Sequence, residues 1–257
     1  MEFLQLKNPH QRDEYISFDE GPHIYTIKGD SKYLSVTTWN HSHFEKFNAD
    51  LIIQKMMKSK TWSTSKYFNM TPDEIKMAWE ENRNKAASDG TRMHENIEKF
   101  YNHCQVNDES IEYSYFKRFH ERYQEEFMAY RTEWMIYDEE LKLAGSIDII
   151  FIDKDKNLYI GDWKRSKEIK KISFGNKCSS NPIISHIPDC NFWHYSLQLN
   201  TYKGILERNY NKKIKSMFLI CLHPDNPNKS YIKMEVPNLQ EEINELFEER
   251  KKQVNNT

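Results

Sequence analysis

The pattern of hydrophobic and polar residues changes near the middle of the chain. In the first half, apolar residues recur every three to four positions, as they do on one face of a helix. This pattern predicts helices over residues 48–60, 71–102 and 111–130. The second of these has the clearest start, because Thr71 and Glu74 fit a capping box and Pro72 occupies the first helical position. A hairpin is predicted ahead of the helices, over 23–36, where two β-rich runs flank a Gly-Asp pair.

The second half of the chain is patterned as strands. The segments TEWMIYD, LKLAGSIDIIFID and NLYIGDWK alternate or run apolar between turn-like residues, which predicts a three-stranded meander. We then expect a helix over 191–209, strands over 214–223 and 230–236, and a closing helix over 238–254. This order of elements predicts an α/β or α+β fold. Residues 1–130 form its hairpin and helical N-terminal region and residues 131–257 its core, in one compact unit.

Composition narrows the class of protein. Charged residues make up 30% of the 257 residues and aromatic residues 14%, which is typical of a folded globular chain. The net charge of -2 gives no global basic signature, so nucleic-acid binding would depend on a local patch. No segment has the roughly 20 apolar residues of a membrane span. The N-terminal residues resemble neither a signal peptide nor a mitochondrial presequence, so we expect an intracellular protein, cytoplasmic or nuclear, without membrane partners.

Two acidic residues and a lysine occupy neighbouring predicted strands. Asp148 lies in the apolar run GSIDIIF, where a carboxylate is costly to bury unless it is paired or bound to a metal. Asp162 and Lys164 lie two residues apart near the end of the next strand, so their side chains leave the same face. The D-x-K spacing alone is more often an exposed ion pair. With a second carboxylate beside it, the group suits Mg²⁺, a water and a phosphate, and the lysine would orient the water or stabilise negative charge.

Two helical pairs accompany these residues. His94 and Glu98 are four positions apart and share one helix face, and histidine is a common metal ligand. Gly90 lies one turn earlier, and a glycine inside a helix often marks the close approach of another segment. Gln198 and Tyr202 have the same spacing on the helix after the meander. Taken singly, each pair is more often a packing or surface feature.

Together, the motifs G-x3-H-x3-E, D, D-x-K and Q-x3-Y, in this order, resemble those of the PD-(D/E)XK nuclease superfamily. The resemblance is strongest to the RecB-like branch, which includes the mitochondrial genome-maintenance exonucleases, and it runs from about residue 33 to 210. The segment YLSVTTW, which contains Ser35, resembles the S-V-T segment near the start of those exonucleases. The resemblance implies a restriction-endonuclease-like mixed sheet flanked by helices, with Mg²⁺ or Mn²⁺ as cofactor and DNA as substrate.

The resemblance also implies roles for single residues. It makes His94, Asp148 and Asp162 metal ligands, together with the backbone carbonyl of Trp163, and it makes Lys164 the catalytic lysine. Isoleucine rather than proline precedes the first aspartate, as is common in this branch. The cysteine cluster of the iron–sulfur relatives is absent, so no iron–sulfur cluster is expected and the four cysteines are expected to be free thiols.

Further residues surround this set. Glu133, at the start of the meander, and Glu98 are expected to reach the metal directly or through water, although a solvated strand position is an equal alternative for Glu133. Segment 164–177 holds six basic residues against one glutamate, which is typical of a solvated loop but would also attract a DNA backbone. Phe174 and Trp39 are candidates to stack on bases, although core packing is the commoner role. The expected nucleic-acid-binding residues are Gln198, Tyr202, Arg165, Lys167, Lys170 and Ser35.

The sequence therefore predicts a metal-dependent deoxyribonuclease of DNA repair or recombination. We expect an exonuclease that acts on single-stranded DNA or DNA ends and hydrolyses phosphodiester bonds with a metal-activated water. A double-strand recombination exonuclease, an endonuclease and a catalytically inactive DNA-binding protein of the same fold are the alternatives. An inactive relative would be expected to have lost at least one of His94, Asp148, Asp162 and Lys164, and this chain retains all four.

Overall fold

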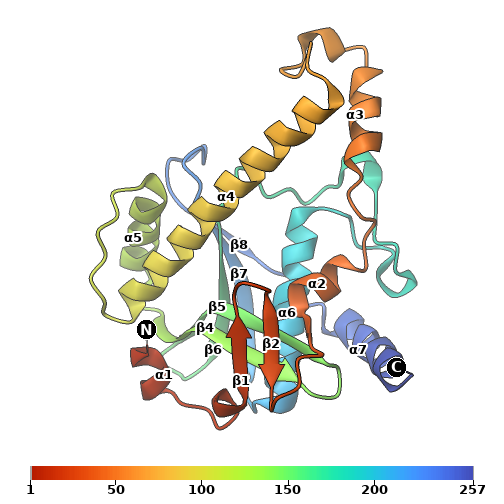
Figure 1. Ribbon diagram of the computed structural model, residues 1–257. Coiled ribbons are helices and arrows are strands. Elements are labelled where there is room, and N and C mark those ends of the chain that lie inside the picture. Colours follow the sequence, from red (N-terminus) through yellow and green to blue (C-terminus); the bar gives the residue numbers. More distant parts are fainter. Residues whose placement is uncertain (1, 257) are drawn as a thin grey trace.

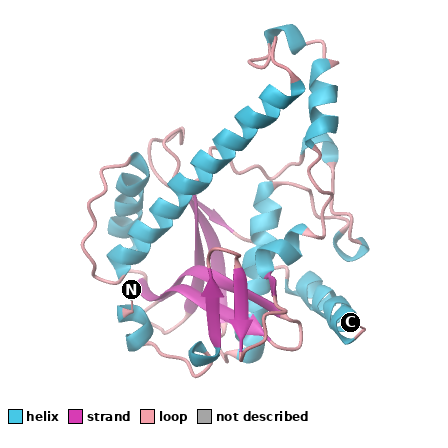
Figure 2. Cartoon of the chain, in the orientation of Figure 1, coloured by secondary structure: helices cyan, strands magenta, loops and turns pink. Residues whose placement is uncertain are grey.

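A computed structural model of the chain describes residues 2–256, and within them helices cover both faces of a mixed six-stranded sheet (Figures 1 and 2). The strands are β1 (Ile16–Asp19), β2 (Ile24–Ile27), β3 (Leu34–Ser35), β4 (Met128–Asp138), β5 (Leu143–Ile152), β6 (Leu158–Lys164), β7 (Ile214–Cys221) and β8 (Ile232–Glu235). The helices are α1 (Phe3–Lys7), α2 (Val36–His41), α3 (Ala49–Met57), α4 (Pro72–Tyr101), α5 (Ile111–Tyr123), α6 (Asn191–Asn209) and α7 (Gln240–Asn255). The predicted mixed α/β class with a sheet flanked by helices is confirmed.

Strand β5 is the centre of the sheet, and its pairing decides where the site lies. β4 runs antiparallel along one edge of β5 from Leu143 to Ile152. The other edge is shared, because β3 pairs in parallel with residues 143–144 and β6 pairs antiparallel with residues 149–152. β7 then adds in parallel to β6, and β8 adds antiparallel to β7. Residues 145–148 of β5 therefore lie in a gap between β3 and β6, and Asp148 is at the β6 side of that gap.

The two faces of the sheet carry separate hydrophobic layers. On β6, Leu158 and Ile160 pack with α2, α6 and α7, whereas Tyr159 and Trp163 pack with α4 and α5. This alternation follows from the two-residue period of a strand. Asp162 has the parity of the first face and Trp163 that of the second. Successive side chains at the end of β6 therefore point towards the two helical layers in turn.

Helix α4 extends well past the sheet. Its N-terminal part projects with α3 as an arm in Figure 1, while its C-terminal part packs on the sheet through Met93 and Ile97. The predicted capping box is present, because Thr71 Oγ1 accepts from the Glu74 N–H and the Glu74 carboxylate accepts from the Thr71 N–H. Gly90 does not mark a close contact as expected: a Cβ placed there meets no atom within 4 Å.

One strand pairing and one element boundary differ from the sequence prediction. The predicted hairpin over 23–36 is wrong in its pairing, because β2 pairs with the preceding β1 and the following run joins the main sheet as β3. The predicted helix 111–130 ends at Tyr123, and β4 begins at Met128, so the proposed boundary between residues 130 and 131 falls inside a strand. Among the described residues, no helix has the length and apolar character that crossing a membrane requires.

Candidate metal centre

The site forms where β5 and β6 stop pairing. The last ladder pair is Ile149 with Gly161. Beyond it, the Asp148 carboxylate replaces a backbone partner, because its Oδ2 accepts a 2.8 Å hydrogen bond from the Trp163 N–H. A side chain thus satisfies a strand-end donor that would otherwise be buried without a partner. This bond fixes the Asp148 carboxylate against the end of β6.

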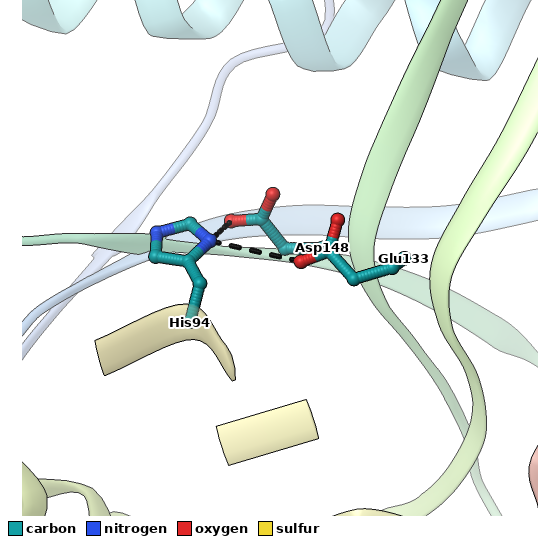
Figure 3. A group of neighbouring side chains, drawn as sticks. All are labelled: His94, Glu133 and Asp148. Carbon is teal, nitrogen blue, oxygen red and sulfur yellow. Dashed lines mark ion pairs between the residues drawn. The ribbon is translucent and has the colours of Figure 1, made fainter. Parts of the chain in front are cut away.

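Three side chains from three elements converge beside this point (Figure 3). His94 of α4, Glu133 of β4 and Asp148 of β5 each offer a ligand atom, and these atoms lie within 4.8 Å of one another. His94 Nδ1 is 3.5 Å from Asp148 Oδ2 and 3.7 Å from Glu133 Oε1. We call His94, Glu133 and Asp148 the triad. It contains two of the predicted metal ligands and one residue whose role the sequence left open.

The backbone of Glu133 is unusual for its position. It lies between the ladder pairs Thr132–Ile149 and Trp134–Ile147, and therefore opposite Asp148, yet its φ is 42°. A positive φ is rare for a residue with a side chain and is strained within a strand. Its Oε2 accepts a 3.0 Å hydrogen bond from Ser146 Oγ, which leaves Oε1 directed at His94. The distorted backbone accompanies a carboxylate that is held in the triad.

The orientation of His94 is set by its second nitrogen. Nε2 is 2.9 Å from the Trp163 carbonyl oxygen. With a proton on Nε2, this contact is a hydrogen bond that turns Nδ1 towards the two carboxylates, as second-shell carbonyls commonly do for ligating histidines. Adjacent ligands of an octahedral ion also lie about 3 Å apart. The Trp163 carbonyl therefore lies beside the triad, and its predicted role as a metal ligand stays a prediction.

Asp162 and Lys164 form a second group next to the triad. The Lys164 Nζ is 2.7 Å from Asp162 Oδ2, and the Asp162 side chain is only 3% exposed. Asp162 lies outside the triad, and its predicted role as a metal ligand stays a prediction. Among the described residues, Asp162 Oδ2 has no hydrogen-bond donor with good geometry, and its close partner is the charge of the Lys164 ammonium. A lone pair of Oδ2 is therefore available to accept another hydrogen bond or to bind a cation. The Trp163 side chain packs with Phe116 and Phe119 on the opposite face.

The charges of the two groups are strongly coupled. Burial acts to lower the pKa of His94, but the negative charges of Asp148 and Glu133 outweigh it and raise this pKa to about 9. Burial raises the pKa of Asp148, and it raises the pKa of Asp162 to about 6. Burial opposes the charged form of Lys164, but Asp162 and Asp148 together raise its pKa above the ordinary value. The protonated forms of His94 and Lys164 therefore balance part of the carboxylate charge in this region.

The residues present fit a divalent cation. The distances of 3.5 and 3.7 Å from Nδ1 to the two carboxylates exceed those of hydrogen bonds. They are somewhat longer than the separation of about 3 Å between adjacent ligands of a Mg²⁺-sized ion, so a small inward movement of the side chains would bring the three atoms to ligand spacing. Two carboxylates and one imidazole suit Mn²⁺ and Mg²⁺ by donor type. An ion bound to the triad would replace the imidazolium charge with a larger one.

No known family matches the chain, and no curated protein is significantly similar to it. The geometry of the site is therefore the basis for inferring a function.

Glu98 lies one turn along α4 from His94 but outside the triad. Burial, reinforced by the charge of Glu133, raises the pKa of Glu98 to about 7. A carboxyl group that is readily protonated near neutral pH must lose its proton before it can bind a metal ion. Its position fits a role at the edge of the site.

The predicted Q-x3-Y pair flanks the site from α6. Gln198 Nε2 donates a 3.1 Å hydrogen bond to the Tyr202 hydroxyl. Tyr202 is 3% exposed and its ring lies over Gly145, in the gap of β5. Ser35 is also buried and caps α2, since its Oγ accepts from the Thr38 N–H. Tyr202 and Ser35 thus shape the gap, whereas Gln198 is only partly buried.

The basic side chains of segment 164–177 differ in their exposure to solvent. The Arg165 guanidinium is held by Asp89 at 3.1 Å and by Glu112 at 2.6 Å, which ties β6 to α4 and α5. Lys167 and Lys170 are exposed, with side chains 77% and 62% accessible. Lys167 pairs with Asp225 at 3.2 Å and Lys170 with Glu168 at 3.1 Å in ion pairs that face solvent, whereas the charge of Arg165 is compensated inside the protein.

The two residues predicted as candidates to stack on bases differ in their exposure to solvent. Phe174 is 96% exposed at the tip of the basic segment, whereas Trp39 is 3% exposed and packs against Phe247 of α7. Trp39 is therefore a core residue. Phe174 is free to contact a ligand.

One neighbour of the site was not anticipated from the sequence. Lys164 Nζ lies 4.5 Å from the centre of the Tyr195 ring on α6. Tyr195 precedes Gln198 by three residues and so shares its helix face. That spacing was the signal in the sequence that could have identified it.

Proposed function

We propose that this chain is a metal-dependent nuclease of the PD-(D/E)XK type that hydrolyses DNA phosphodiester bonds. The observation that carries the proposal is the triad of His94, Glu133 and Asp148 beside the Asp162–Lys164 ion pair. Acids that converge on one point, with a lysine next to them, form the arrangement that phosphodiester hydrolysis with a divalent ion requires. A purely structural role would not explain why five ionisable side chains, His94, Glu133, Asp148, Asp162 and Lys164, meet at a gap in the sheet.

Within this proposal the residues divide the work. The triad holds the ion, which would polarise a phosphoryl oxygen and activate a water. Asp162 holds the Lys164 ammonium at 2.7 Å beside that position. The pKa of Lys164 is raised mainly by Asp162 and Asp148 against the opposing effect of burial, so the side chain stays charged at neutral pH. Lys164 therefore acts as a cation that stabilises the phosphorane-like charge, and not as a general base.

The surroundings favour DNA with an accessible end as the substrate. Lys167 and Lys170 follow β6 directly and form only exposed ion pairs, with Asp225 and Glu168. Exposed ion pairs are weak, so both lysines could contact phosphates instead. Phe174 exposes an aromatic ring in the same segment, and stacking on aromatic rings is how single strands are bound without sequence preference. We therefore propose an exonuclease acting on single-stranded DNA or DNA ends.

The test is cleavage of linear and circular DNA, single- and double-stranded, with Mg²⁺, Mn²⁺ or EDTA. We expect cleavage of linear single strands with either metal, none with EDTA, and circles left intact. Cut circles would replace the exonuclease with an endonuclease. A protein that binds DNA but cuts none of these substrates with any metal would refute the nuclease and leave a binding protein.

Variants assign the residues. Lys164→Ala should abolish most cleavage while DNA affinity, measured by anisotropy in Ca²⁺, stays within a few-fold, because the ammonium is assigned to the transition state. His94→Ala and Asp148→Ala should weaken Mn²⁺ binding in calorimetric titrations. Lys154→Ala, on the exposed β5–β6 turn, is the matched control and should behave as wild type. Wild-type cleavage by Lys164→Ala would remove that residue from the reaction.

A further inference from the structure

The ammonium of Lys164 is held between two groups from different elements. Asp162 Oδ2, on the same strand, lies 2.7 Å from Nζ. The ring of Tyr195, on α6, lies on another side with its centre 4.5 Å from Nζ. A cation over an aromatic face is attracted to the ring, and more strongly where water is largely excluded. The Lys164 side chain is 17% exposed, so this contact is largely shielded from water.

Two contacts restrict a side chain that is otherwise flexible. A lysine has four rotatable side-chain bonds, and one ion pair leaves its ammonium free to swing about the carboxylate. The Tyr195 ring closes off part of that motion. The ring is itself fixed, because Tyr195 is partly buried and packs on the hydrophobic layer of α2, α6 and α7. The two contacts together determine where the Lys164 charge is presented.

The contribution of Tyr195 comes from its ring and not from its hydroxyl. Among the described residues, the Tyr195 hydroxyl has no hydrogen-bond partner, whereas the Tyr202 hydroxyl accepts from Gln198 and the Tyr210 hydroxyl accepts from the Tyr137 N–H. A tyrosine retained for its hydroxyl would be expected to use it. Phenylalanine should therefore replace Tyr195, and an aliphatic residue should not.

We propose that Tyr195 is a positioning residue, whose ring holds the Lys164 ammonium beside Asp162 and the triad. The proposal rests on the proposed nuclease function for its catalytic consequence, but the contact itself can be measured without catalysis. If the ring is lost, Lys164 remains charged and paired with Asp162, but its ammonium samples a wider region. A misplacement of about 1 Å costs roughly 100-fold in rate.

The experiment compares Tyr195→Leu with Tyr195→Phe. Lysines are converted to ¹³C-dimethyl-lysines, which keep their charge, and the Lys164 methyl signal is assigned by its absence in Lys164→Arg. The ring should shift this signal upfield in wild type and in Tyr195→Phe, and the shift should vanish in Tyr195→Leu. Cleavage under saturating DNA should fall about 10- to 100-fold in Tyr195→Leu, with DNA affinity in Ca²⁺ nearly unchanged, and should be retained in Tyr195→Phe.

Tyr159→Leu is the matched control. It removes a tyrosine from the other end of β6, where the Tyr159 ring lies 5.5 Å from Lys215 Nζ, and it should change neither the Lys164 signal nor the cleavage rate. An unshifted Lys164 signal in wild type, or a shift that survives in Tyr195→Leu, would overturn the proposal. So would a lost shift with unchanged cleavage, or loss of activity in Tyr195→Phe. If wild type cuts no DNA, the nuclease function fails, and the Lys164 signal alone decides whether Tyr195 positions it.

Discussion

Gly145 and Gly90 allow the same substitution to be tested in opposite environments. Gly145 lies in the gap of β5, where a methyl group would be 2.8 Å from Tyr202 Cε1 and 3.1 Å from its hydroxyl oxygen. Tyr202 cannot turn away easily, because it is 3% exposed and hydrogen-bonded to Gln198. Gly90 lies within α4 and has no atom within 4 Å of such a methyl group.

The expected free energies of unfolding follow from these contacts. Neither glycine has a positive φ, so replacing it with alanine should stabilise the protein by about 0.4–1 kcal/mol through the unfolded chain alone. At position 145 this gain opposes an overpacking cost of about 1–3 kcal/mol. We expect Gly145→Ala to be less stable than wild type by about 1–2 kcal/mol, and Gly90→Ala to be more stable by about 0.5–1 kcal/mol.

Urea denaturation followed by circular dichroism measures both changes. Combining Gly145→Ala with Tyr202→Leu should cost less than the sum of the two single changes, because the leucine vacates the clashing volume. Equal stability of Gly145→Ala and Gly90→Ala would refute the argument, because it would mean that Tyr202 does not close on β5. Additive costs in the double variant would lead to the same conclusion.

Three further outcomes are expected. Glu98→Gln should have a higher melting temperature than wild type in EDTA, and the difference should grow from about pH 4.5 to 7 and then stay constant. Burial raises the pKa of Glu98 to about 7, so wild type loses stability over this range of pH, whereas the glutamine variant does not. A difference that does not change with pH would contradict this. Trp163→Phe should lower stability by about 1–3 kcal/mol in urea but leave cleavage within a few-fold, since the ring packs away from the triad; a loss above roughly 100-fold in a folded variant would oppose it. Alanine at three basic residues should weaken DNA binding and flatten its dependence on salt, and an unchanged slope would mean that they are merely solvated. These residues are Lys167, Lys170 and Lys171.

Much of the fold was predictable because its signals are local. The helical period and capping box predict α4 within a residue at each end, and strand-like runs predict β4, β5 and β6. Asp162 and Lys164 had to leave the same face of β6, because side chains on a strand alternate with a period of two. The position of Asp148 in an apolar strand predicted a charged group within the fold. These features depend on residues close in sequence, so the chain alone carries them.

Other features depend on which distant segments meet. The run around Ser35 has a strand-like composition that would suit either a hairpin with β2 or pairing with β5. Only the folded structure shows that it pairs with β5. Glu133 could have been solvated, and the φ of 42° that accompanies its place beside His94 is a property of the assembled strands. Gly90 and Gly145 are indistinguishable by type, yet Tyr202 covers only the second.

The candidate site divides in the same way. The sequence by itself determined which ionisable residues are available, and which faces of α4 and β6 carry His94, Asp162 and Lys164. The tertiary structure decided that Glu133 lies with Asp148 beside His94, and that the Tyr195 ring lies against the Lys164 ammonium. The physical reason is that periodicity specifies a direction from one element, whereas a distance between side chains also needs the packing of both elements that carry them.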